Sequence, residues 1–76
     1  MSGSYLARVF REVTGHAPIE YLIHMRVRKA MELLRDTPWS VTKIAASVGF
    51  TNANYFSRQF KAVTGGSPTA YRKGVL

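Results

Sequence analysis

Apolar side chains recur every three or four positions between residues 18 and 35, and this spacing predicts one long helix. Projected at about 100° per residue, they form a single stripe with charged residues outside it. The stripe consists of Ile19, Leu22, Ile23, Val27, Ala30, Leu33 and Leu34. Arg26 interrupts the stripe, so we expect its stem to lie along the core with its head group paired or in solvent. Pro18 suits the first helical position, and the segment DTP at residues 36–38 ends the helix.

Capping signals over residues 40–65 predict two shorter helices joined by a tight turn. Ser40 is placed to cap the first helix, and Gly49 can adopt the left-handed conformation that stops it. Thr51 or Asn52 then caps the second helix. A short helix, a glycine turn and a second helix are the pattern of a helix-turn-helix unit.

Gly65 ends the second of these helices, and Ser67 followed by Pro68 opens a last short helix over residues 67–76. No segment shows the alternation of apolar and polar residues that a half-buried strand requires. The chain is therefore predicted to be all-α, and residues 1–76 are expected to form a single small domain.

Residues 4–21 and 54–71 repeat each other without a gap and are identical at eight of their eighteen positions. The identical pairs are Tyr5/Tyr55, Arg8/Arg58, Phe10/Phe60, Val13/Val63, Thr14/Thr64, Gly15/Gly65, Pro18/Pro68 and Tyr21/Tyr71. A shared glycine stop and proline start indicate one supersecondary unit used twice. The predicted helix within residues 1–15 thus corresponds to the second helix of the later unit. The counterpart of its first helix would fall before residue 1, so we expect the first unit to be incomplete and the chain to be a fragment.

The repeated helix has an apolar side and a polar side. In the second copy, Phe56, Phe60 and Val63 oppose Asn54, Ser57, Arg58 and Lys61; in the first, Leu6, Phe10 and Val13 oppose Ser4, Ala7, Arg8 and Arg11. Such a polar stripe suits a helix in a DNA major groove, because Arg can bind guanine bidentately, Asn can bind adenine, and small residues allow close approach. An ordinary solvent-exposed helix face carries similar residues, so the pattern alone leaves both interpretations open.

Eleven Lys and Arg residues against four acidic ones give a net charge of +7, which favours a polyanionic partner. The chain has no cysteine, so disulfides and thiolate metal sites are excluded, as is usual in a reducing cytoplasm. No apolar run approaches the ~20 residues of a membrane span. These features predict a cytoplasmic protein that spans no membrane.

Two other classes of function fit the sequence less well. An enzyme is disfavoured because the only histidines are His16 and His24, and a pair of His24 with Glu20 would supply at most two metal ligands. The chain also lacks a phosphate-binding glycine loop, and no cofactor is expected. A cationic helical module that binds a protein partner or an anionic membrane surface remains the alternative to DNA binding.

The segment KIAASVGFTNANYFSRQFKAVTGGSPTAYR, residues 43–72, resembles the signature of the AraC/XylS family of bacterial transcription regulators. The matching residues are Ile44, Ala45, Gly49, Phe50, Phe56, Ser57, Arg58, Phe60, Lys61, Gly65, Ser67, Pro68, Tyr71 and Arg72. The segment SYLARVFREVTG, residues 4–15, is similar to the second helix of the family's other helix-turn-helix. The segment YLIHMRVRKAMELLRDT, residues 21–37, is similar to the linker helix that joins the pair.

This resemblance implies two helix-turn-helix units joined by a linker helix over residues 18–35, with recognition helices in successive major grooves of double-stranded DNA. It implies base contacts by Ser4, Ala7, Arg8, Ala53, Asn54, Ser57 and Arg58. Phosphate contacts are expected from Arg11, Lys43 and Lys61, and from backbone amides near Ser2 and Thr51. The family also implies RNA polymerase as a partner. In an incomplete first unit, Leu6, Phe10 and Val13 would lack a packing partner and are expected to favour self-association.

Overall fold

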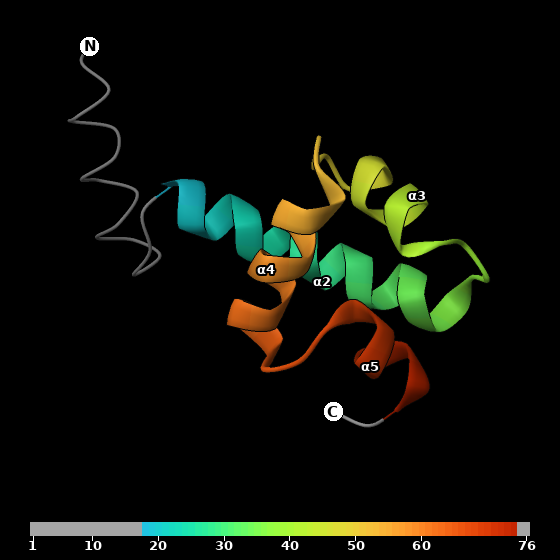
Figure 1. Ribbon diagram of the computed structural model, residues 1–76. Coiled ribbons are helices and arrows are strands. Elements are labelled where there is room, and N and C mark those ends of the chain that lie inside the picture. The colour runs from blue at the N-terminus through green and yellow to red at the C-terminus, as the bar shows by residue number, and fades with distance from the viewer. Residues whose placement is uncertain (1–17, 75–76) are drawn as a thin grey trace, which may run out of the picture.

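A computed structural model describes residues 18–74 and places them in four helices (Figure 1). These are α2 (Pro18–Asp36), α3 (Val41–Ser47), α4 (Ala53–Thr64) and α5 (Pro68–Lys73). No strand occurs within residues 18–74, so the all-α prediction is confirmed for this part of the chain. The long helix α2 crosses the middle of the molecule and contacts each of the other three helices. The helix predicted within residues 1–15 lies outside the described residues.

The predicted caps position α3 and the turn that follows it. Ser40 is the N-cap of α3, and its hydroxyl oxygen accepts a hydrogen bond of 3.1 Å from the backbone N–H of Lys43. Gly49 adopts the left-handed region with φ of 101°, as its place at the end of the helix predicted. Of the two candidates for the cap of α4, the structure selects Asn52: its side-chain oxygen accepts from the N–H of Tyr55 at 3.0 Å.

The same signals define the end of α4 and the start of α5. Gly65 has φ of 92° and donates its N–H to the carbonyl of Lys61 at 2.8 Å. Ser67 caps α5 by accepting from the N–H of Ala70 at 3.0 Å, and Pro68 occupies the first turn. Each cap satisfies a backbone group that the helix itself leaves without a partner.

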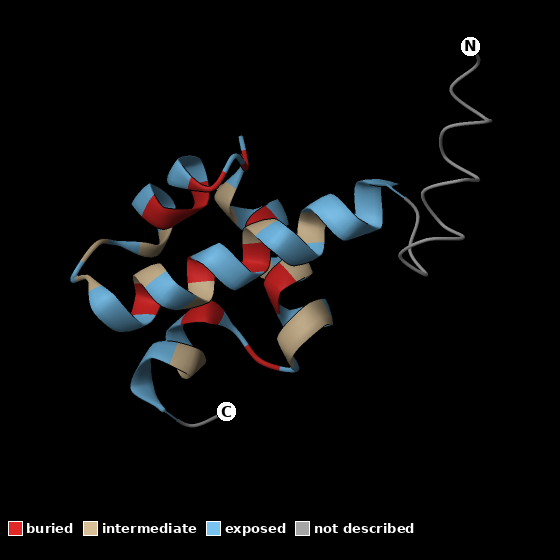
Figure 2. Cartoon of the chain, turned by 180° about the vertical axis from the view of Figure 1, so that it is seen from behind, coloured by how far each residue is buried: buried red, intermediate tan, exposed pale blue. Residues whose placement is uncertain are grey.

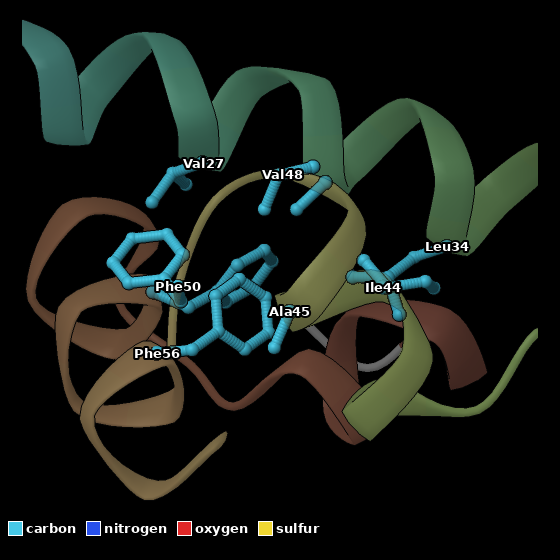
Figure 3. Close-up of a cluster of buried hydrophobic side chains, with 9 residues drawn as sticks. Val27, Leu34, Ile44, Ala45, Val48, Phe50 and Phe56 are labelled. Atoms are coloured by element: carbon cyan, nitrogen blue, oxygen red, sulfur yellow. The ribbon is translucent and has the colours of Figure 1, made fainter. Parts of the chain in front are cut away.

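One hydrophobic cluster joins α2 to the helix-turn-helix (Figures 2 and 3). Its buried members are Val27, Ala30 and Leu34 from α2, Ile44 and Ala45 from α3, Val48 and Phe50 from the turn, and Phe56 and Phe60 from α4. Burying a side chain of the size of Phe stabilises a fold by about 1.5–3 kcal/mol. This cluster therefore fixes how α4 is rotated about its own axis.

The predicted apolar stripe of α2 is wrong at its first two members. Ile19 is 61% exposed and Leu22 is 40% exposed, although both belong to the predicted stripe. At about 100° per residue, Leu22 lies about 140° from Val27, at the opposite edge of that stripe. The reason is tertiary: α3, α4 and α5 lie along the middle and C-terminal part of α2, so periodicity identified the right face but not how much of its length these helices cover (Figure 1).

Arg26 connects α2 to the turn between α3 and α4. Its guanidinium carbon lies 5.9 Å from the ring centroid of Phe50. A β-carbon added to Gly49 would lie only 3.0 Å from the Arg26 Nε atom, so the head group packs directly on the glycine backbone. Arg26 is half-buried, and its head group packs on this turn and holds it against α2.

The last helix, α5, packs against the C-terminal end of α2. The Arg72 side chain donates from Nε to the carbonyl oxygen of Leu34 at 3.1 Å and from a terminal nitrogen to that of Thr37 at 3.2 Å. On the other side of α5, the ring of Tyr71 lies edge-on to Phe60, with 5.8 Å between centroids. A cation at these carbonyls complements the negative end of the α2 dipole.

Candidate nucleic-acid interface

The solvent-facing side of α4 is set by the phenylalanines on its opposite side. Phe56 and Phe60 are fully buried, so the residues projecting away from them must face solvent. In angular order around the helix, the exposed residues are Lys61, Asn54, Arg58, Ala62 and Tyr55. They cover an arc of about 120°, and Arg58 lies near its centre. We refer to these five residues as the α4 face.

Two of the four base contacts predicted on α4 belong to this face. Asn54 and Arg58 are both exposed there, one turn apart. Ser57 is half-buried at the border of the face, and Ala53 is half-buried and packs against the hydrophobic cluster. The structure thus brings Asn54 and Arg58 together and holds Ala53 and Ser57 further back. Base contact by any of the four stays a prediction.

Sequence reasoning missed two members of the α4 face. Ala62 lies next to Arg58 on the exposed arc, where a small side chain allows another surface to approach closely. Tyr55 is 38% exposed at the edge of the face. The identity of Tyr5 and Tyr55 in the repeat was the available signal, but the sequence analysis gave Tyr55 no role on either side of the helix.

The predicted phosphate contacts surround this face. Lys61 is exposed on α4, and Thr51 is exposed in the segment before it, where the free N–H groups of a helix start attract anions. Lys43 is exposed on α3, but its ammonium group lies 4.3 Å from the centroid of the Trp39 ring, a cation–π contact. Phosphate binding by these three residues stays a prediction.

The electrostatic character of this half of the chain is uniform. Residues 37–74 contain no Asp or Glu, and their cations are Lys43, Arg58, Lys61, Arg72 and Lys73. The described carboxylates all belong to α2, where Glu32 pairs with Lys29 at 3.3 Å and Asp36 with Arg35 at 3.6 Å. Hence no carboxylate side chain of residues 37–74 offsets the cations of the α4 face.

The contacts predicted for the first unit cannot be placed. Ser2, Ser4, Ala7, Arg8 and Arg11 lie outside the described residues, as do the apolar residues expected to favour self-association.

Within residues 18–74, no group of three His, Asp or Glu side chains gathers as a metal site would require. None of the described helices is long and apolar enough to cross a membrane.

A short capped helix, a glycine turn and a second helix with an exposed face whose charged residues are all cations define a helix-turn-helix domain. The family model described as a helix-turn-helix domain matches residues 1–74. The chain therefore belongs to the AraC/XylS-type helix-turn-helix family, as the signature in residues 43–72 indicated.

Known relatives agree with this assignment. The transcriptional activator RhaR of Pectobacterium carotovorum subsp. carotovorum (strain PC1) is 46% identical over 67 residues, which are 88% of this chain and 24% of RhaR. RhaR and two other curated relatives are several times longer than this chain, which spans between 22% and 27% of their lengths.

Two solved structures share the fold. The DNA-binding domain of AdpA, a global transcriptional factor crystallised in complex with a target DNA, superimposes with a TM-score of 0.93 at 38% identity, over 97% of this chain and 67% of that one. A probable AraC family transcriptional regulator from Rhodopseudomonas palustris CGA009 gives a TM-score of 0.86 at 28% identity, over 99% of this chain and 71% of that one.

Proposed function

We propose that this chain binds double-stranded DNA sequence-specifically, as the helix-turn-helix part of a bacterial transcription regulator, with α4 in a major groove. The observation that carries this proposal is the position of Arg58 at the centre of an exposed face, in a segment, residues 37–74, that contains cations and no carboxylate side chain. The likeness to the AdpA domain, which was crystallised with its target DNA, supports the same function. The family is one of transcription regulators, and we propose no catalytic activity.

The roles of the side chains follow from their chemistry. Arg58 would donate two hydrogen bonds to O6 and N7 of a guanine, and Asn54 would pair with N6 and N7 of an adenine. The small side chains of Ala53, Ser57 and Ala62 would let the helix approach the base edges. Contacts of Lys61, Lys43 and the backbone at Thr51 with phosphate would fix the orientation of the domain without reading sequence.

Substitution of Arg58 tests this proposal. A preferred duplex is first selected from a random pool, and binding of Arg58→Ala and Lys61→Ala is then measured on that duplex and on a scrambled one. Losing a bidentate base contact costs about 1–3 kcal/mol on the preferred site, so Arg58→Ala should lose its preference for that duplex. Lys61→Ala should weaken binding to both duplexes about equally and lower the salt slope by about 1.

A matched control comes from α5. Lys73→Ala removes one exposed positive charge outside the α4 face, so it should leave the preference between the two duplexes intact. Equal losses of Arg58→Ala on the preferred and scrambled duplexes would show that Arg58 does not read bases. A chain that selects no duplex from the pool would contradict the proposed function itself.

The family likeness carries two further expectations. A second recognition helix within residues 1–15 would occupy the neighbouring major groove, with Arg8 in the role of Arg58. RNA polymerase would be a partner of the regulator. Both stay predictions, and the selected duplex tests the first: two recognition helices require two specified segments about 10 base pairs apart.

A further inference from the structure

Tyr55 is held in place at the edge of the α4 face. Its backbone N–H donates to the side-chain oxygen of Asn52, the cap of α4, at 3.0 Å. Its ring lies edge-on to Phe50, with 5.9 Å between centroids and 62° between planes, and Phe50 is itself buried in the turn. A large side chain that remains 38% exposed is therefore fixed on its inner side by the core.

The guanidinium of Arg58 approaches the same ring. Its carbon lies 5.9 Å from the centroid of Tyr55, within the range of a cation–π contact. Residues three apart are neighbours on a helix surface, and helical side chains lean toward the N-terminus, so Arg58 reaches back over Tyr55. A free Arg side chain carries about 2 kcal/mol of rotamer entropy, part of which it loses on binding. If Arg58 already contacts Tyr55 in the free protein, it loses less rotamer entropy when DNA binds.

The repeat keeps the same two residues together. Tyr5 and Arg8 have the spacing of Tyr55 and Arg58, although their own structure lies outside the described residues. The neighbouring candidate base contacts change between the copies, Ser4 against Asn54 and Ala7 against Ser57. The tyrosine and arginine are thus retained as a pair in a helix whose other groove-facing positions differ.

We propose that Tyr55 is a positioning residue for Arg58. Its ring, anchored by Phe50, orients the guanidinium of Arg58 over the α4 face before DNA is bound and so strengthens the recognition of guanine. This proposal rests on the proposed function, and it assigns the selectivity of α4 to a tyrosine and arginine pair instead of to the arginine alone. Tyr55 would act through Arg58 and need not touch a base.

A double-mutant cycle tests the proposal with the full 76-residue chain. Tyr55→Leu removes the aromatic face, and Tyr55→Phe is the matched control that keeps the ring and loses only the hydroxyl. Tyr55→Leu should weaken binding to the selected duplex about two- to fivefold, the range of an exposed cation–π contact, with little change on a scrambled duplex. Tyr55→Phe should retain affinity. In an Arg58→Ala background, Tyr55→Leu should have no further effect.

Two binding outcomes would overturn the proposal. If Tyr55→Leu costs as much in the Arg58→Ala background as in the wild type, the tyrosine acts independently of the arginine. If Tyr55→Phe loses as much affinity as Tyr55→Leu, the hydroxyl group is what matters, as it would for a direct hydrogen bond to DNA.

A measurement on the free chain keeps the proposal testable apart from DNA and from any folding defect of Tyr55→Leu. In the NMR spectrum, the side-chain protons of Arg58 should be displaced upfield by the ring current of Tyr55, and Lys61 on the same face supplies the reference. Arg58 protons at random-coil positions would overturn the contact. A displaced Arg58 signal in a chain that selects no duplex would instead leave the contact standing and contradict the proposed function.

Discussion

Gly49 and Gly65 both adopt the left-handed region, with φ of 101° and 92°, yet their surroundings differ. An added β-carbon on Gly65 would meet nothing within 4 Å, whereas on Gly49 it would lie 3.0 Å from the Arg26 guanidinium. Glycine is therefore favoured at position 49 for two reasons: the backbone has a positive φ, and the Arg26 side chain packs too close for a β-carbon. At position 65 only the positive φ favours glycine.

This difference predicts unequal costs of the same substitution. Gly65→Ala should lower the free energy of unfolding by about 1–2 kcal/mol, the cost of a left-handed L-residue. Gly49→Ala should cost about 0.5–1 kcal/mol more, because the new methyl group displaces Arg26 from Phe50. Urea unfolding measures both. In an Arg26→Ala background the two costs should become similar, and equal costs in the wild type would contradict the role given to Arg26.

The contact between Lys43 and Trp39 provides an optical test of a predicted phosphate contact. Trp39 is the only tryptophan, and the Lys43 ammonium lies 4.3 Å from its ring centroid. If Lys43 binds a DNA phosphate, its ammonium must leave the ring, so the fluorescence of Trp39 should change when duplex is added. Lys43→Met keeps the aliphatic stem without the charge and should abolish that change. The same response in both proteins would mean that Lys43 stays on the ring.

At the scale of whole helices, Arg72 joins α5 to α2 through hydrogen bonds to the carbonyls of Leu34 and Thr37. Arg72→Ala leaves these groups without their donor, and we expect it to lower the free energy of unfolding by about 1 kcal/mol, less than the roughly 1.5–3 kcal/mol of a charged hydrogen bond because Arg72 is exposed. Lys73→Ala, its neighbour on α5, should cost less than about 0.5 kcal/mol. The shift of the urea midpoint measures both, and similar shifts would argue against the closure of α2 by Arg72.

The starts of α3, α4 and α5 and the ends of α3 and α4 were predictable because the signals that set them are local. The end of α5 was not: the prediction ran to residue 76, whereas α5 ends at Lys73 and the left-handed Gly74 caps it. Ser40, Gly49, Gly65 and Ser67 each act within one turn of chain, and each performs the predicted role. The choice between Thr51 and Asn52 stayed open, since both side chains can cap.

What the sequence did not provide depends on contacts between distant segments. The exposure of Ile19 and Leu22 follows from where α3, α4 and α5 lie along α2, which periodicity cannot show. The contact of Arg26 with Gly49 joins α2 to the turn between α3 and α4, and no local sequence pattern predicts it. The site was partly predictable: the polar side of α4 yielded Asn54 and Arg58, while the roles of Tyr55 and Ala62 required the observed rotation of α4.

For the molecule as a whole, charge separates DNA binding from the alternative of a cationic module on a protein or an anionic membrane. A protein that contacts about six phosphates releases condensed counterions, so its affinity for duplex should fall about a thousandfold between 50 and 200 mM salt. Titration of the chain against a duplex and against anionic vesicles over this range gives the answer. A flat response with the duplex would contradict groove binding, and stronger binding to vesicles would favour the alternative.

The absence of Asp and Glu from residues 37–74 determines how this part of the chain responds to the pH and salt of the medium. Apart from those two residues, His is the side chain that ordinarily changes charge between about pH 4 and 8, and both histidines precede residue 37. The helix-turn-helix therefore has no side chain of the kinds that gain or lose a proton over that range. Among simple changes of medium, ionic strength is therefore what weakens the electrostatic field of these residues.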